Sequence, residues 1–369
     1  MRFTAWFSAP RRTLADYFDH GQDNFLLLRL AAAAMVMYGH SYAFCGMPNN
    51  GDIIARRGLG YGIYSGSIAV DMFFAISGFL VCGSYLKRAN LETFLKARAL
   101  RILPALVTCV ILCALVLGPL FTTLSLSNYV RNREAWDYIW LNLKLGSDMQ
   151  WNLPGVFTHN FYPGAVNGSL WTLPAEIRMY AWIAILGTLG ILRRRWLANI
   201  ILAALFVFGV VAINHLPLVI HPSHVPLAGM FLIGTLGFVN RDAIPVNSLL
   251  MLTLILFAAL AHHSFLFPYL FGLTVAYFCF WFAYVPNFHW FNRLGDYSYG
   301  LYLWGFPVQQ AVSVSIGKPV HPWVNLAVSL PIALALAIAS WHFVEKSALR
   351  WKTRYQALPR LELRQSMSK

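Results

Sequence analysis

The chain has 369 residues, of which 58% are hydrophobic and 11% are charged, and its formal net charge is +14. A soluble protein of this length does not need so large an apolar fraction, so the composition predicts a polytopic membrane protein. In a soluble protein the positive charge would suggest nucleic acid as a partner. Here Lys and Arg on cytoplasmic loops account for it, and no nucleic-acid partner is predicted. The five cysteines are scattered without a metal-like spacing, so no metal site is predicted.

In chain order, the apolar segments predict an all-α integral membrane protein with about ten transmembrane helices. Residues 1–20 are not expected to form a signal peptide, and a short interfacial helix on the cytoplasmic side is predicted there, within an N-terminal segment of residues 1–23. Residues 24–345 form the predicted transmembrane domain, and residues 346–369 form a short basic cytoplasmic tail. The predicted spans are 24–43, 66–86, 100–122, 169–190, 197–214, 224–239, 246–263, 267–285, 297–316 and 323–344.

The distribution of Lys and Arg predicts the orientation of these spans. An even number of spans places both termini on one side, and most basic residues fall in the termini and the even-numbered loops. Both termini are therefore predicted to be cytoplasmic. The longest loop, residues 123–168, then faces outside. It is rich in Trp, Tyr and Asn, which suits a sugar-binding surface but is equally typical of an interfacial aromatic belt.

The first predicted span carries Arg29 and His40, and an ionisable group inside a membrane costs at least about 3 kcal/mol. Eleven positions correspond to about three helical turns plus 20°, so both side chains lie on one helix face, ~16.5 Å apart along the axis. The simpler interpretation is a snorkelling Arg and a structural His. For the pair, a polar pathway along this helix face is favoured.

Under the predicted orientation, Asp71 in the second span lies at a depth similar to that of His40. A carboxylate beside an imidazole fixes its tautomer and raises its basicity, as a general base requires. A purely structural His–Asp pair is the alternative. Arg98 and Arg101 lie at i and i+3 near the cytoplasmic end of the third span. With Lys96 and Arg29 they form a predicted basic cluster suited to phosphates. The alternative is that these arginines only set the topology.

The same residues lie in segments that resemble six motifs of the membrane acyltransferase-3 family. RLAAAAMVMYGH, from Arg29 to His40, resembles the family's Arg-x10-His signature. Gly305 stands where many members have His, Met179 replaces an aromatic residue and Ser347 replaces a Pro. The extracytoplasmic esterase-like domain that is fused to some members is not expected here. The other five matching segments are VDMFFAISGFL (Val70–Leu80), RALR (Arg98–Arg101), SLWTLPAEIRMY (Ser169–Tyr180), LGDYSYGLYLWGFPV (Leu294–Val308) and WHFVEKS (Trp341–Ser347).

The resemblance implies an integral-membrane O-acyltransferase of the cytoplasmic (inner) membrane. It would move an acyl group, usually acetyl, from acyl-CoA to a hydroxyl of a surface or exported saccharide or glycolipid. The CoA phosphates would bind at Arg29, Arg98 and Arg101. His40 would act as general base or as a covalent acyl carrier, with Asp71 orienting it. Residues expected to line the tunnel or to bind substrate are Ser77, Trp171, Glu176, Tyr180 and Tyr302.

Two other functions are compatible with a membrane protein of this composition. A transporter or flippase should show inverted repeats and paired broken helices, and the sequence shows neither. A non-catalytic scaffold does not need buried Arg, His, Asp and Glu side chains. For Ser77 the alternative to lining the tunnel is a hydrogen bond from its hydroxyl to a carbonyl oxygen of its own helix. The sequence leaves open the acceptor, the acylated hydroxyl and the oligomeric state.

Overall fold

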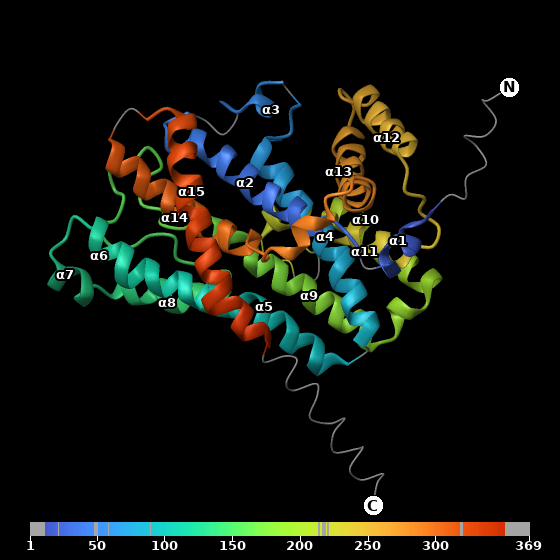
Figure 1. Ribbon diagram of the computed structural model, residues 1–369, viewed down its shortest axis with the longest axis horizontal. Helices are drawn as coiled ribbons and strands as arrows, with labels where there is room; N and C mark the ends of the chain where they lie inside the picture. The colour runs from blue at the N-terminus through green and yellow to red at the C-terminus, as the bar shows by residue number, and fades with distance from the viewer. Residues whose placement is uncertain are drawn as a thin grey trace, which may run out of the picture. The chain divides into compact units, whose positions relative to one another are not determined.

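The computed structural model describes residues 12–20, 22–47, 51–57, 59–88, 90–212, 215, 219, 221–317 and 320–350. Within these residues the regular structure is helical, with isolated β-bridges and no strand, so the all-α prediction is confirmed (Figure 1). The α-helices are α1 (Leu14–His20), α2 (Phe25–Phe44), α3 (Ile53–Arg56), α4 (Ser65–Arg88), α5 (Leu91–Leu112), α6 (Gly118–Phe121), α7 (Leu126–Arg131), α8 (Arg133–Lys144), α9 (Leu173–Thr188), α10 (Arg195–Val211), α11 (Val225–Val239), α12 (Ser248–Leu260), α13 (Phe267–Tyr284), α14 (Ser298–Ile316) and α15 (Pro322–Ser340). The 3₁₀ and π segments are η3 (Cys113–Leu117), η4 (Gly168–Thr172), η5 (Ile191–Arg193), η6 (Pro222–His224), η7 (His289–Arg293) and η8 (Trp341–Glu345).

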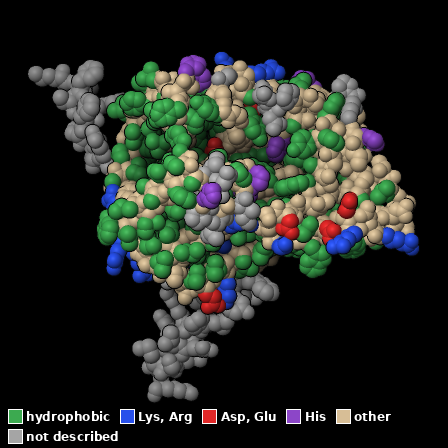
Figure 2. Space-filling model, turned by 180° about the vertical axis from the view of Figure 1, so that it is seen from behind, with side chains coloured by type: hydrophobic (Ala, Val, Ile, Leu, Met, Phe, Trp, Pro, Cys, Tyr) green, Lys and Arg blue, Asp and Glu red, His purple; other side chains and the backbone are tan. Residues whose placement is uncertain are grey.

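Each of the ten predicted spans overlaps a helix. In the described part of the chain, six helical stretches are long and apolar enough to cross a membrane, and α10 and α12 are apolar but shorter. Figure 2 shows hydrophobic side chains gathered over a large area of one face, as expected of a surface that meets lipid. The protein is therefore a multi-pass membrane protein, and the number ten and the cytoplasmic termini stay predictions. The six stretches are Phe25–Phe44, Ser65–Arg88, Leu91–Phe121, Pro222–Val239, Phe267–Tyr284 and Pro322–Arg350.

Helix α5, which corresponds to the third predicted span, begins earlier than that span. Asn90 is the N-cap of α5, and its side chain accepts a hydrogen bond of 2.8 Å from the backbone N–H of Thr93. This cap starts the helix at Leu91, about two turns before the apolar run. Arg98 and Arg101 therefore lie inside α5. The predicted span, which began at residue 100, had placed them at the start of the helix.

The predicted outer loop contains helices α7 and α8. Helix α8 packs against α5, with Tyr138 and Asn142 fully buried. Its opposite side exposes Trp136 and Trp140, at 44% and 71% of their surface. This amphipathic helix suits either an interfacial position or an exposed aromatic surface, so both interpretations of the loop are retained.

The chain folds as two compact units, each described separately. Among the described residues the first unit comprises 12–29, 68–87 and 185–294, and the second comprises 30–67, 88–184 and 295–350. In the first unit, α4 and α11 cross with their backbones in contact. A Cβ atom on Gly234 would lie 2.0 Å from the carbonyl oxygen of Ala75, so only glycine fits this crossing. Small residues at such crossings are the usual way in which membrane helices approach closely.

In the second unit, α14 and α15 form the most extensive helix pair, and a buried polar network joins them to α2. The Nε2 atom of Gln309 donates to the carbonyl oxygen of Met37 at 2.8 Å and to Asn325 Oδ1 at 3.1 Å. Asn325 Nδ2 in turn donates to Ser313 Oγ at 2.9 Å. Gln309 and Asn325 are fully buried, so these bonds satisfy amide N–H groups that would otherwise be costly in a membrane. The network fixes the part of α2 that carries His40.

Candidate active site

The predicted site residues divide between the two units. Because each unit is described separately, the pairing of His40 with Asp71 and the clustering of Arg29 with Arg98 and Arg101 stay predictions. Arg29, Asp71 and Ser77 belong to the first unit. The second unit contains His40, Arg98, Arg101, Trp171, Glu176, Tyr180 and Tyr302.

His40 lies in α2, the helix that also carries Arg29. Its ring packs edge-on against two aromatic rings, with centroid distances of 5.3 Å to Phe306 and 5.9 Å to Phe44. The Nδ1 atom is buried and has no hydrogen-bond partner among the described residues. Leaving a buried polar atom unsatisfied costs about 1–3 kcal/mol, and an ionisable side chain inside a membrane protein is a candidate functional residue. The apolar rings hold the imidazole in place while one nitrogen stays available for chemistry.

Gly305 precedes Phe306 and explains how closely α14 approaches α2. A Cβ atom at this position would lie 2.8 Å from Met37 Cγ. A larger side chain would therefore clash with the buried Met37 side chain unless that side chain moved. The structure gives a packing reason for glycine at the position where many family members have His.

Gln310 anchors the predicted outer loop beside the rings of Phe44 and Phe306, a role that the sequence alone did not indicate. Its Nε2 atom donates to the carbonyl oxygens of Tyr162 (2.7 Å) and Ala165 (2.8 Å). Its Oε1 atom accepts a hydrogen bond of 2.7 Å from Asn160 Nδ2. The Tyr162 ring then lies 5.9 Å from the ring of Phe306, which contacts His40. A Gln in the middle of an apolar helix was the available signal.

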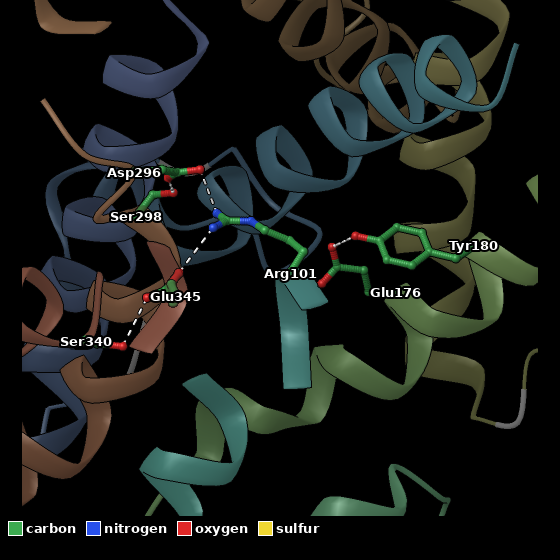
Figure 3. A network of polar contacts seen from close by, with 7 residues as sticks. All are labelled: Arg101, Glu176, Tyr180, Asp296, Ser298, Ser340 and Glu345. Atoms are coloured by element: carbon green, nitrogen blue, oxygen red, sulfur yellow. Dashed lines mark hydrogen bonds and ion pairs between the residues drawn. The ribbon is translucent and has the colours of Figure 1, made fainter. Parts of the chain in front are cut away.

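Arg101 is held by two carboxylates, as Figure 3 shows. Its Nη2 atom lies 2.6 Å from Asp296 Oδ2, and its Nη1 atom lies 3.1 Å from Glu345 Oε2. The side chain of Arg101 is 15% exposed and that of Glu345 is 2% exposed. Ser298 donates to Asp296 at 2.6 Å and Ser340 donates to Glu345 at 3.0 Å. This ion-pair network fixes α5 to the start of α14 and to η8, the π-helical segment at the end of α15.

Arg98, the other arginine of the same motif, has different surroundings. Its Cζ atom lies 5.7 Å from the ring centroid of Tyr180, whose hydroxyl donates a hydrogen bond to Glu176. The Nε atom of Arg98 is buried without a hydrogen-bond partner in the described part of the chain. In Figure 3 the guanidinium of Arg101 points toward Asp296 and Glu345 and away from Glu176. The two arginines thus lie on one helix but belong to separate contacts.

Trp171 and Tyr302 lie in two segments, η4 and α14, that are joined by a hydrogen bond. Trp171 belongs to η4, and the hydroxyl groups of Thr172 and Tyr302 form a hydrogen bond of 2.8 Å. A Cβ atom on Gly168 would lie 2.6 Å from the Phe306 ring, so η4 packs directly on the ring that contacts His40. These contacts make η4 and α14 parts of one site. Among the described residues, no group of three His, Cys, Asp or Glu side chains is placed to hold a metal ion.

Taken together, these features describe an integral-membrane enzyme. A non-catalytic span does not need a buried imidazole with an unsatisfied nitrogen, or a buried arginine between two carboxylates. A family model described as an acyltransferase domain matches residues 23–342. The chain belongs to this family, acyltransferase-3, and it is an acyltransferase.

Two relatives are similar to this chain over different lengths. An O-acetyl transferase of Shigella phage Sf6 is 29% identical over 351 residues, covering 89% of this chain and 97% of that protein. Nodulation protein 10 of Rhizobium leguminosarum bv. viciae is 31% identical over 180 residues, covering 47% of this chain and 46% of that protein. No solved structure matches.

Proposed function

We propose that this protein transfers an acetyl group from cytoplasmic acetyl-CoA to a hydroxyl of a surface or exported saccharide, and that it acts in the inner membrane. The name of the phage relative, O-acetyl transferase, supports acetyl as the transferred group. A saccharide acceptor is supported by the exposed tryptophans of α8 and by the loop residue Tyr162, whose ring contacts Phe306 next to His40.

The unsatisfied Nδ1 atom of His40 is the observation on which the mechanism rests. A sugar hydroxyl is a poor nucleophile, so a base must take its proton as the oxygen attacks the thioester carbonyl. The new C–O bond forms, the C–S bond breaks, and the thiolate of CoA leaves with the electron pair and receives the proton from the imidazolium. A covalent route is the second possibility, in which His40 first takes the acetyl group and then passes it to the hydroxyl.

In this proposal the donor binds along the polar face of α2. The CoA phosphates lie at the end of this face that carries Arg29, where the sequence predicts a basic set with Arg98 and Arg101, and the pantetheine arm extends toward His40. The separation of Arg29 and His40 along the helix, ~16.5 Å, leaves room for such an extended arm. Asp71 would orient the imidazole. Residues expected to line the path are Ser77, Trp171, Glu176, Tyr180 and Tyr302.

The test is transfer of labelled acetyl from acetyl-CoA by the purified protein in liposomes, with saccharides extracted from the host surface as acceptors. Mass spectrometry of surface glycans from cells with and without the gene then identifies the acceptor. Loss of one O-acetyl group, restored by the wild-type gene and not by His40→Ala, is the expected result. Saccharide that crosses the liposome membrane without becoming acetylated would contradict the proposal and favour a flippase.

A further inference from the structure

Arg88 is a second arginine with an unsatisfied nitrogen near Arg98. Helix α4 ends at Arg88, and α5 begins at Leu91. The Nη1 atom of Arg88 is buried, and it has no hydrogen-bond partner in the described part of the chain. Neither Arg88 nor Arg98 has a carboxylate partner among the described residues. Arg98 lies about two turns into α5, so the two arginines flank the same short turn, and the charge of Arg98 acts on that of Arg88.

Two neighbouring guanidinium groups with unsatisfied donors form an unfavourable arrangement unless an anion lies between them. An anion would accept hydrogen bonds from both and cancel their repulsion. Guanidinium groups match the geometry of phosphate oxygens, which can accept paired hydrogen bonds. A simpler role for Arg88 is a cation at the C-terminus of a helix on the cytoplasmic side. That role does not require a buried, unsatisfied Nη1 atom.

Arg101 does not offer such a site. Its Nη1 and Nη2 atoms are both engaged by carboxylates, at 3.1 Å and 2.6 Å. Their two negative charges exceed the single positive charge of Arg101, so an approaching phosphate would be repelled. Breaking either ion pair to bind a phosphate would also leave a largely buried carboxylate unpaired, which is costly.

We propose that Arg88 and Arg98 together bind one phosphate group of acyl-CoA, and that Arg101 is a positioning residue that does not contact the donor. This inference rests on the proposed function and refines it. Arg88 becomes a donor-binding residue, and the two arginines of the RALR segment take different roles. The phosphate of an anionic lipid headgroup has the same chemistry, so the experiment must separate the two sources.

The experiment measures CoA binding by isothermal titration calorimetry with the protein in nanodiscs of phosphatidylcholine alone. Arg88→Gln and Arg98→Gln should each weaken CoA binding by roughly tenfold or more. If both contact one phosphate, the double variant should lose much less than the product of the two single losses, since the effects are coupled. Lys87→Gln is the matched control. It removes an exposed charge one residue from Arg88, from a side chain whose Nζ atom lies over the ring of Phe18, and should leave CoA binding unchanged.

Several results would overturn the inference. The first is a CoA affinity of Arg88→Gln that equals that of wild type in phosphatidylcholine and differs from it only when phosphatidylglycerol is added. The site would then bind the lipid headgroup and not CoA. Another is fully multiplicative losses in the double variant, which would mean separate anion sites. A third is an Arg101→Gln protein that is as thermally stable as wild type but binds CoA tenfold more weakly.

CoA binding is measured without an acceptor, so its outcome is separate from that of the proposed function. A protein that binds CoA through Arg88 and Arg98 but transfers no acetyl group to a saccharide would contradict the proposed function alone. A protein that acetylates saccharide with a normal donor requirement in both single variants would contradict this inference alone.

Discussion

Arg101 and Glu345 are 244 residues apart in the sequence, yet Arg101 Nη1 lies 3.1 Å from Glu345 Oε2 in a largely buried ion pair. Glu345 is the last residue of the π-helical segment η8, directly after α15. The pair ties the RALR segment of α5 to the last family motif, and Asp296 ties it to the motif before that. The network of Arg101 with Asp296 and Glu345 therefore joins three of the six motifs.

Removing one partner of this network should destabilise the protein. Arg101→Ala leaves Asp296 and Glu345 as largely buried, uncompensated carboxylates, and breaking a buried pair costs about 3–5 kcal/mol. Glu345→Ala should have a smaller effect because Asp296 still pairs with Arg101. The measurement is thermal unfolding of the purified protein in detergent.

The exposed pair between Lys144 and Asp148, at 63% and 46% exposure, provides the control for that experiment. Lys144→Ala should change stability by no more than about 1 kcal/mol, because exposed ion pairs contribute little. Arg101→Ala with the unfolding temperature of wild type would show that the network has no structural role.

Gln310 should affect use of the acceptor and not of the donor. Gln310→Leu removes hydrogen bonds to the carbonyl oxygens of Tyr162 and Ala165 and to Asn160, so the loop is no longer fixed beside Phe306. Each buried group left unsatisfied costs about 1–3 kcal/mol, so part of the loop should detach. We expect the KM for the saccharide to rise roughly tenfold, with the KM for acetyl-CoA within about twofold of wild type.

Ser315→Ala on the same helix is the control for Gln310. Its hydroxyl donates to the carbonyl oxygen of Ala311 in its own helix, and the residue is exposed. Both KM values should therefore stay at wild-type levels. A Gln310→Leu enzyme with unchanged saccharide kinetics would mean that the loop does not contribute to acceptor binding.

The helices were predictable because their signal is local. Long apolar runs and the motif order are properties of neighbouring residues, and every predicted span overlaps a helix. The N-cap at Asn90 was also a local signal, but the predicted span followed hydropathy and so began too late. The partners of Arg101 were not predictable, because Asp296 and Glu345 reach it only through the packing of distant helices.

The candidate site was only partly predictable for the same reason. Arg29 and His40 share one helix, so their common face follows from helical geometry. The difference between Arg98 and Arg101 depends on which carboxylates pack nearby, and a motif cannot encode this. Gln310 was visible as a polar residue in an apolar run, but its role depends on the path of a loop about 150 residues away in sequence, which packing alone determines.

The topology makes a prediction of its own. Reporter fusions after residue 350 should be active in the cytoplasm, and a fusion between α7 and α8 should be active outside. Accessibility of single cysteines introduced at Trp140 and at Arg350 would give the same result without a fusion partner. A cytoplasmic position for Trp140 would reverse the assignment of donor and acceptor sides.

Asp71 should be needed for turnover if it orients His40. Asp71→Asn keeps the size of the side chain, but an amide can favour the wrong imidazole tautomer, so kcat should fall by at least about a hundredfold. The KM for acetyl-CoA should change little. Equal activity of Asp71→Asn and wild type, normalised to folded protein, would show that His40 works without this carboxylate.

His40 gives the last prediction, because the proposed mechanism depends on it. A positioned base typically contributes ~10²–10⁴ in rate, so His40→Ala should lower transfer by about this factor while the protein stays folded and inserted. A purely structural His40 predicts the opposite pattern. Its ring packs on Phe306 and Phe44, so truncation would then lower stability while each folded molecule kept its activity. Transfer is therefore measured per folded protein, with unfolding temperature recorded for the same samples. Rapid quench without acceptor separates the two chemical routes, since an acetylated His40 accumulates only on the covalent route. Wild-type turnover by folded His40→Ala would contradict both routes.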